Sequence, residues 1–247
     1  MRGELNVPLF KISVTPRTAA QVVAAIFESI DRGGLQIANY NLHGVYMHMT
    51  NEAFAAYTGG ADLRLIDGWP ILAASLWPRL GSSKYRVGST DWLEVLLRHE
   101  ERSRLRIVAI GGTSAASRLA EAAVTSAYEG LIWEGIDGYD GIGLANTDET
   151  DRAIEGANLV LVAMGMPKQE EWIVAHEDQL RGKVVANVGG VIDYLAGAQS
   201  LAPRWMGRLG VEWLYRLLLD PRRLADRYLL EPFRLFAILR RRGSSDD

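Results

Sequence analysis

Asp67 is the residue whose type and position most directly suggest chemistry. It ends a short alternating apolar run, 63–67, and is followed by Gly68. A carboxylate at the end of a strand can act as a general base in a cleft. It can equally cap a helix that starts at Trp69-Pro70. Spacing alone favours the cap, so the residue pattern leaves both interpretations of Asp67 open.

The glycine pair and hydroxyl of Gly111-Gly112-Thr113 follow one strand-like run and precede a helix-like segment. Glycines let a phosphate approach the backbone, and the start of a helix offers free N–H groups. A tight strand-to-helix turn uses the same residues. The G-x-G-x-x-G spacing of dinucleotide-binding folds is missing, which argues against a nucleotide-dependent oxidoreductase.

The densest motif is Met164-Gly165-Met166-Pro167-Lys168-Gln169-Glu170-Glu171-Trp172. Pro and Glu suit any helix start, whereas Lys168 opposes the helix dipole there. A cation in that place is easier to explain if a phosphate or nucleotide binds, so Gly165, Lys168 and Gln169 are candidate residues for binding it. Asp193, in Gly189-Gly190-Val191-Ile192-Asp193, is either a further candidate or only a local hydrogen-bonding residue.

No metal or other cofactor is expected. The chain has no Cys, and its four His show no metal-ligand spacing. It also lacks an Asp-x-Asp triplet, the short acidic motif that can hold a metal ion on a diphosphate. The lack of Cys also excludes a disulfide framework and a thiol nucleophile, and it fits a reducing cytoplasm. A departing diphosphate would then be neutralised by cationic side chains, and the fixed fork of arginine donors suits that task.

Six short apolar or β-branched runs must form the elements that position these residues: 35–41, 63–67, 105–110, 131–136, 158–164 and 184–188. Helix-like segments lie between most of them, at about 43–57, 89–101, 114–128 and 168–180, and Thr15-Pro16 predicts the cap and first residue of an earlier helix. The alternation predicts an α/β fold with an open, mostly parallel, Rossmann-like sheet covered by helices on both faces. Ligands of such sheets bind beyond the carboxyl ends of the strands, where the candidate residues lie.

The end of the chain differs from the rest in charge. Residues 1–200 carry 17 Lys+Arg against 24 Asp+Glu, whereas residues 201–243 carry ten Arg against four acidic residues. We therefore expect an α/β catalytic domain over 1–200 and a basic, amphipathic helical appendage over 201–247. Helices rich in Arg, Trp and Phe bind anionic membrane surfaces. A terminal helix pair packed on the body, with a solvated charged face, explains the pattern equally well.

No run reaches the roughly 18 apolar residues of a spanning helix, and the amino terminus has no signal-peptide pattern. We therefore expect a soluble or peripheral protein.

These blocks, in this order, resemble the WecG/TagA/CpsF glycosyltransferase family from about Leu35 to Tyr228. The blocks that carry the resemblance are Leu65-Ile66-Asp67-Gly68, the motif 165–172, 189–193 with Ala196-Gly197, Ala202-Pro203-Arg204-Trp205, 210–217, Pro221-Arg222-Arg223 and Arg227-Tyr228. The resemblance implies an inverting, metal-independent transfer from a UDP-sugar to a polyprenyl-diphosphate-linked saccharide in bacterial cell-surface polysaccharide synthesis. It implies a cytoplasmic, peripheral location on the inner face of the membrane, with an appendage that closes the site and docks on anionic lipid. Nucleic acid is not an expected partner, and a homo-oligomer is compatible with the sequence.

The resemblance also assigns roles to individual residues. Asp67 is the general base that deprotonates the acceptor hydroxyl, Gln169 and Asp193 contact the donor, and Tyr139 stacks on uracil. Asn39, Asn41 and Arg86 line the acceptor or sugar pocket. The candidates for stabilising the leaving diphosphate are Arg216, Arg222, Arg223 and Arg227.

Two departures leave the sugar open. The family's Thr-x-Asn is Asn39-Tyr40-Asn41 here, and its Arg-Ala-Pro is Leu201-Ala202-Pro203. Asn41-Leu42-His43 is similar to the branch that transfers glucose in xanthan-type polysaccharide assembly, so UDP-glucose stands beside UDP-N-acetylmannosamine as donor. The alternative function is a non-catalytic nucleotide-sugar-binding or membrane scaffold protein, which would not need Asp67 or the arginines.

Overall fold

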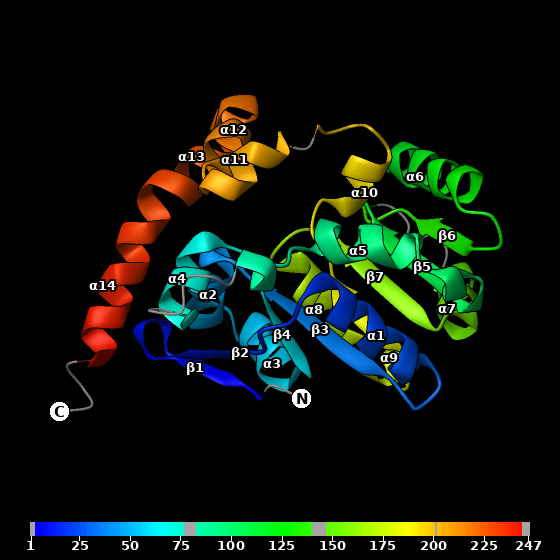
Figure 1. Ribbon diagram of the computed structural model, residues 1–247, viewed down its shortest axis with the longest axis horizontal. Coiled ribbons are helices and arrows are strands. Elements are labelled where there is room, and N and C mark those ends of the chain that lie inside the picture. The colour runs from blue at the N-terminus through cyan, green and yellow to red at the C-terminus, as the bar shows by residue number, and fades with distance from the viewer. Residues whose placement is uncertain (1–2, 77–82, 140–146, 201, 244–247) are drawn as a thin grey trace.

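The computed structural model describes residues 3–76, 83–139, 147–200 and 202–243. Its centre is a six-stranded parallel sheet in the order β4-β3-β8-β7-β5-β6 (Figure 1). The strands are β3 (Leu35–Tyr40), β4 (Leu63–Ile66), β5 (Arg106–Gly111), β6 (Ile132–Ile136), β7 (Leu159–Ala163) and β8 (Val184–Asn187). All six predicted runs are therefore strands, and the predicted Rossmann-like sheet is confirmed.

Strand β7 is apolar throughout because both faces of the sheet are covered there. In β7 all five residues are buried. Leu159 and Leu161 pack into one hydrophobic cluster, whereas Val160 and Val162 pack into another. The first cluster takes residues from α1 (Ala19–Ile30), α5 (Ser89–Leu97), α6 (Ser114–Ala127) and α10 (Val191–Leu195). The second takes residues from α3 (Glu52–Gly60), α7 (Thr147–Gly156), α8 (Lys168–Ala175) and α9 (Glu177–Leu180).

The prediction that Thr15 caps the first helix is wrong. Helix α1 begins at Ala19, and the Thr18 hydroxyl accepts a hydrogen bond from the Gln21 N–H at 3.3 Å. Thr15 is buried, and its N–H donates to the Arg64 carbonyl at 2.7 Å. Thr15 thus serves a long-range contact with β4, while an equally good local cap lies three residues later.

The helix predicted at 43–57 is two helices, α2 (Leu42–Thr50) and α3. Asn51 separates them, and its side-chain oxygen accepts from the Phe54 N–H at 2.8 Å. An antiparallel hairpin of β1 (Leu5–Val7) and β2 (Ile12–Val14), joined by η1 (Pro8–Phe10), was not predicted. The remaining elements of the body are α4 (Trp69–Leu76), η2 (Ser83–Tyr85) and η3 (Glu100–Arg104).

The end of the chain forms the predicted helical appendage. It consists of α11 (Arg204–Leu209), α12 (Glu212–Leu219), α13 (Pro221–Ala225), the π-helical turn η4 (Asp226–Leu230) and α14 (Glu231–Gly243). In Figure 1, α14 extends away from the other appendage helices and lies along α2. Leu235 of α14 is buried in a third hydrophobic cluster, which includes the β1–β2 hairpin and α2. Leu201, one of the departures noted above, lies outside the described residues, and none of the described helices has the length and apolarity to cross a membrane.

Candidate active site

A cavity of about 570 Å3 lies between the carboxyl ends of the strands and the appendage. Its wall includes Asp67 after β4, Ala163 at the end of β7 and Asn187 at the end of β8, with α12, α13 and η4 on the opposite side. Most of the predicted site residues meet there: Asn39, Asn41, Asp67, Arg86, Gly112, Tyr139, Gly165, Gln169, Asp193, Arg216, Arg223 and Arg227. The predicted location at one edge of the sheet therefore agrees with the geometry.

Four predicted residues do not line this cavity. Thr113 caps α6, where its hydroxyl accepts from the Ala116 N–H at 3.2 Å. Gly111 packs so closely on β7 that a Cβ would lie 2.3 Å from the Ala163 carbonyl oxygen. These contacts account for Gly111 and Thr113 as parts of a tight turn. Lys168 and Arg222 are exposed on α8 and α13.

The Asp67 carboxylate is partly exposed at the cavity wall. The Asp67 N–H donates to the Tyr40 carbonyl at 2.7 Å, which fixes the backbone at the end of β4. Burial raises the pKa of Asp67 from 3.8 to about 6; Arg216 and Arg86 partly offset this rise, while Glu212 and Asp91 add to it. A carboxylate with this pKa is ionised at neutral pH, yet it is basic enough to accept a proton from a hydroxyl as that hydroxyl reacts.

Gly88 sets the space around that carboxylate. A Cβ on Gly88 would lie 2.6 Å from Asp67 Oδ1, closer than atoms of this kind approach without moving. Gly88 has φ −84° and ψ 171°, a conformation that any residue can adopt. The glycine is thus explained by the room that Asp67 needs rather than by the backbone.

The three cavity arginines differ in how their charges are compensated. Arg216 forms an ion pair with Glu212 and lies 5.9 Å from the Tyr194 ring centroid. Arg223 Nε contacts Asp220 Oδ2 at 2.6 Å. Arg227 Nε is buried and has no hydrogen-bond partner among the described residues. Burial lowers the pKa of Arg227, because removing the guanidinium from water destabilises its charged form.

Sequence reasoning missed Glu170, Asn187 and Ser89. They form a hydrogen-bond network at the floor of the cavity with the predicted residues Gln169 and Asn39. Glu170 Oε1 accepts from Gln169 Nε2 at 2.7 Å and from Asn187 Nδ2 at 2.6 Å. Asn39 Nδ2 in turn donates to the Asn187 carbonyl at 2.7 Å and to Ser89 Oγ at 3.1 Å. Because Glu170 takes both amide N–H groups, it fixes which way Gln169 and Asn187 face.

This orientation has consequences for the cavity wall. Gln169 Oε1 accepts from the Gly189 N–H at 3.2 Å, which holds the turn after β8. Asn39 Oδ1 is buried without a hydrogen-bond partner in the described part of the chain. Burial raises the pKa of Glu170 to about 7. No sequence signal separated Glu170 from an ordinary helix-start carboxylate.

The predicted donor residues at the other side of the cavity are more open. Asp193 Oδ2 accepts from Gln199 Nε2 at 3.3 Å, and burial raises the pKa of Asp193. Tyr139 is 68% exposed at the rim, so its ring face is free to stack on a flat ligand. Together with Arg223, these residues leave the cavity polar and open at one end.

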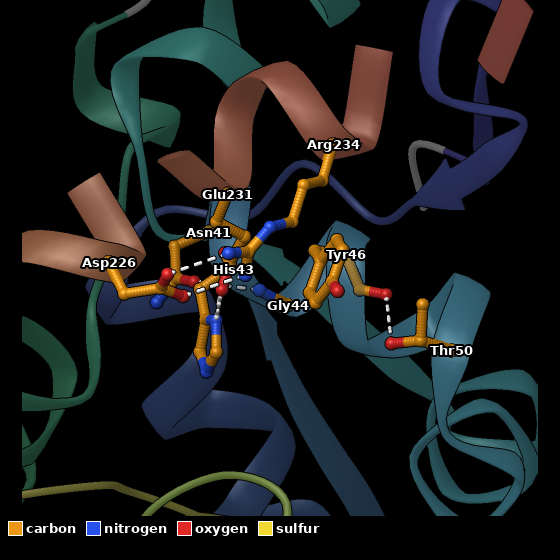
Figure 2. Close-up of polar contacts among 8 residues, drawn as sticks. All are labelled: Asn41, His43, Gly44, Tyr46, Thr50, Asp226, Glu231 and Arg234. Carbon is orange, nitrogen blue, oxygen red and sulfur yellow. Dashed lines mark hydrogen bonds and ion pairs between the residues drawn. The ribbon is translucent and has the colours of Figure 1, made fainter. Parts of the chain in front are cut away.

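The appendage is fastened to the body beside the cavity. Asn41 caps α2, accepting from the Gly44 N–H at 2.9 Å, and His43 follows in the first turn. His43 Nδ1 lies 2.7 Å from Glu231 Oε2 at the start of α14 (Figure 2). The appendage is thus tied directly to the element that carries Asn41.

No three His, Cys, Asp or Glu side chains are grouped as a metal site in the described ranges. The cavity wall carries three cations that could contact an anionic ligand, Arg216, Arg223 and Arg227.

Comparison with known proteins places this site in context. The sequence model described as "Glycosyl transferase WecG/TagA/CpsF family" matches residues 7–246. An N-acetylglucosaminyldiphosphoundecaprenol N-acetyl-beta-D-mannosaminyltransferase of Staphylococcus aureus (strain MRSA252) is 29% identical over 206 residues, covering 82% of this chain and 79% of that protein. The enzyme of the same name from Staphylococcus aureus (strain NCTC 8325 / PS 47) is 28% identical over 204 residues, with the same coverage.

Proposed function

The chain belongs to the WecG/TagA/CpsF glycosyl transferase family and is a glycosyltransferase; from this premise we propose that it moves a hexose from a UDP-sugar to a polyprenyl-diphosphate-linked saccharide. One observation carries the proposal. The cavity brings a carboxylate with a pKa of about 6, Asp67, together with an arginine that has no hydrogen-bond partner at Nε among the described residues, Arg227. The first suits deprotonation of a hydroxyl and the second suits a departing anion.

The proposed reaction is a single in-line displacement. Asp67 accepts the proton of the acceptor hydroxyl while the hydroxyl oxygen forms a bond to the anomeric carbon. The bond from that carbon to the UDP oxygen breaks, and UDP leaves with the electron pair. One displacement inverts the anomeric centre, so an α-linked donor gives a β-linked product.

Stabilisation of the leaving diphosphate is assigned first to Arg227. Arg216 and Arg223 already have carboxylate partners, Glu212 and Asp220. Arg227 forms no ion pair with a carboxylate among the described residues, so an arriving diphosphate replaces a desolvated state by a charge-assisted contact. Arg216 stays close enough to Asp67 to lower the pKa of that carboxyl, which keeps the base ionised.

The remaining cavity residues are assigned to substrate binding. Tyr139 stacks on uracil, Asp193 hydrogen-bonds the donor, and Gln169 holds the Gly189 turn beside it. The unpartnered Asn39 Oδ1 accepts a hydroxyl or N–H of a sugar. The names of the relatives point to N-acetylglucosamine-diphosphate-lipid as acceptor and N-acetylmannosamine as the transferred sugar. UDP-glucose stays the second candidate donor, because Asn39 stands where family members have Thr.

The appendage is proposed to close the cavity and to bring the enzyme to the inner face of the cytoplasmic membrane. It carries exposed apolar side chains at Trp205, Trp213, Leu218, Leu219, Leu229, Leu230, Phe233 and Phe236. Exposed Arg240 and Arg241 lie at the end of the same helix as Phe233 and Phe236. Apolar and cationic side chains on one helix suit an anionic lipid surface.

A donor panel tests the proposal. The full-length protein is incubated with a lipid-diphosphate-linked N-acetylglucosamine carrying a short lipid, and with UDP-N-acetylmannosamine, UDP-glucose or UDP-N-acetylglucosamine. We expect one donor to give equal amounts of UDP and of a β-linked disaccharide product, identified by mass spectrometry and NMR. Binding of UDP without turnover of any donor would favour the non-catalytic alternative.

A further inference from the structure

Two carboxylates lie next to Arg227 along the chain, and each of them could neutralise it. Asp226 precedes Arg227, and Glu231 follows four residues later, about one helical turn away. Neither carboxylate forms an ion pair with Arg227 in the described structure. Asp226 accepts from both terminal nitrogens of Arg234, at 2.8 and 2.9 Å. Glu231 faces His43, whose Nδ1 lies 2.9 and 2.7 Å from its two oxygens (Figure 2).

The two competing contacts differ in strength because they differ in exposure. The Arg234 and Asp226 side chains are 52% and 57% exposed, so water and salt weaken their pair. The His43 and Glu231 side chains are only 14% and 8% exposed. Breaking a buried contact of this kind leaves a carboxylate that must find another cation.

Two other carboxylates of the appendage form ion pairs with arginines that lie three or four residues away. Glu212 lies four residues from Arg216 and forms an ion pair with it. Asp220 lies three residues from Arg223 and forms an ion pair with that arginine. Arg227 and Glu231 are four residues apart but form no ion pair among the described residues. The turn between them is π-helical, and His43 of the body contacts Glu231.

We propose that His43 is a positioning residue that holds Glu231 away from Arg227 and so keeps the Arg227 guanidinium free for an anionic ligand. The inference rests on the proposed function, because the ligand is the leaving diphosphate of the UDP-sugar. His43 belongs to the body and Arg227 to the appendage, so Glu231 is held away from Arg227 only while α14 is seated on α2. Docking of the appendage on the body therefore also makes the Arg227 guanidinium available to the diphosphate.

A double-variant experiment tests this role. His43→Leu introduces an apolar side chain of similar size and removes the N–H that contacts Glu231, so Glu231 is released to pair with Arg227. We expect the dissociation constant for UDP, measured by calorimetry, to rise about tenfold or more and kcat/KM for a short-lipid acceptor to fall in parallel. His43→Leu combined with Glu231→Gln should return both values to within about threefold of wild type, because a neutral amide cannot neutralise Arg227. Glu231→Gln alone should bind UDP like wild type.

Controls separate this mechanism from a general loss of structure. His43→Gln keeps a donor for Glu231 and should retain UDP affinity, whereas Arg234→Ala releases only the exposed Asp226 and should change it less than about twofold. Thermal unfolding identifies any variant that does not fold, and His43→Ala replaces His43→Leu in that case. The proposal is overturned if His43→Leu binds UDP like wild type. It is also overturned if adding Glu231→Gln to His43→Leu does not restore the affinity for UDP. Failure of the wild-type protein to bind UDP would instead overturn the proposed function, and this role with it.

Discussion

Replacing Asp67 by Asn should inactivate the enzyme and stabilise it at the same time. The variant keeps the size of the side chain but removes the base, so transfer should fall by roughly 100-fold or more. UDP affinity should be retained, since the arginines that we assign to the diphosphate are unchanged. The stability gain follows from the pKa of Asp67, which burial raises from 3.8 to about 6.

The sign of that gain follows from proton binding. Between the unfolded pKa and the folded pKa, the folded protein holds a proton on Asp67 that the unfolded chain has lost. The stability of the wild type therefore falls as pH rises through this window, and the full cost is present above pH 6. Asn carries no such cost, so the free energy of unfolding of Asp67→Asn at pH 7.5 should be higher by an amount on the order of 2 kcal/mol, after allowance for solvent at the partly exposed carboxylate.

Denaturant unfolding at pH 7.5 and at pH 4 measures this difference, which should shrink toward the acid end. The same pKa predicts the acid limb of the wild-type pH–rate profile, where activity at pH 5 should be about one tenth of its plateau. Glu212→Gln removes a neighbour that raises the pKa of Asp67 and should move the limb to lower pH. Near wild-type transfer by Asp67→Asn, or an acid limb near pH 4, would refute the assignment.

Three further predictions concern the space beside Asp67, the need for a metal and the exposed surface of the appendage. Gly88→Ala should leave the melting temperature nearly unchanged but reduce turnover about tenfold or more, because the new Cβ would lie 2.6 Å from Asp67 Oδ1 and turn the carboxylate away; Gly59→Ala, where a Cβ meets nothing, is the control in the same assay. Activity should persist in excess EDTA, since no Asp-x-Asp triplet occurs in the sequence; loss of activity that Mg²⁺ or Mn²⁺ restores would contradict the role given to arginine. Phe233→Ser with Phe236→Ser should abolish sedimentation with anionic liposomes and spare turnover of a short-lipid acceptor, because these rings are 75% and 58% exposed. The control Leu119→Ser, at a 57% exposed leucine on α6, should retain both sedimentation and turnover.

The sequence predicted the sheet well because its inner strands are largely buried on both faces, so each of them appears as a short, mainly apolar run. The same topology predicted that residues after β3, β4, β7 and β8 meet at one edge. Local sequence signals did not decide where the first helix begins, because two possible caps lie close together. Thr15-Pro16 and Thr18 are both good helix starts, and the pairing of Thr15 with Arg64 on β4 decided between them.

The parts of the site that sequence reasoning missed depend on contacts between distant residues. Glu170 has the ordinary type for a helix start, and only the fold places Asn187 against it. His43 and Glu231 are separated by 188 positions, so nothing local links them. Among the arginines, sequence reasoning named four candidates for the diphosphate. It did not show that Arg222 lies outside the cavity or which of the others already had partners. That distinction required the ion pairs of Arg216 and Arg223.

The location of UDP tests the central claim most directly. A crystal structure of the wild-type protein with UDP should show the diphosphate in the cavity, with its oxygens within hydrogen-bond distance of the Arg227 guanidinium. The uracil should lie against Tyr139, and the Asp67 carboxylate should face the space where the anomeric carbon of a donor would sit. UDP bound outside this cavity, or a diphosphate remote from Arg227, would contradict the account.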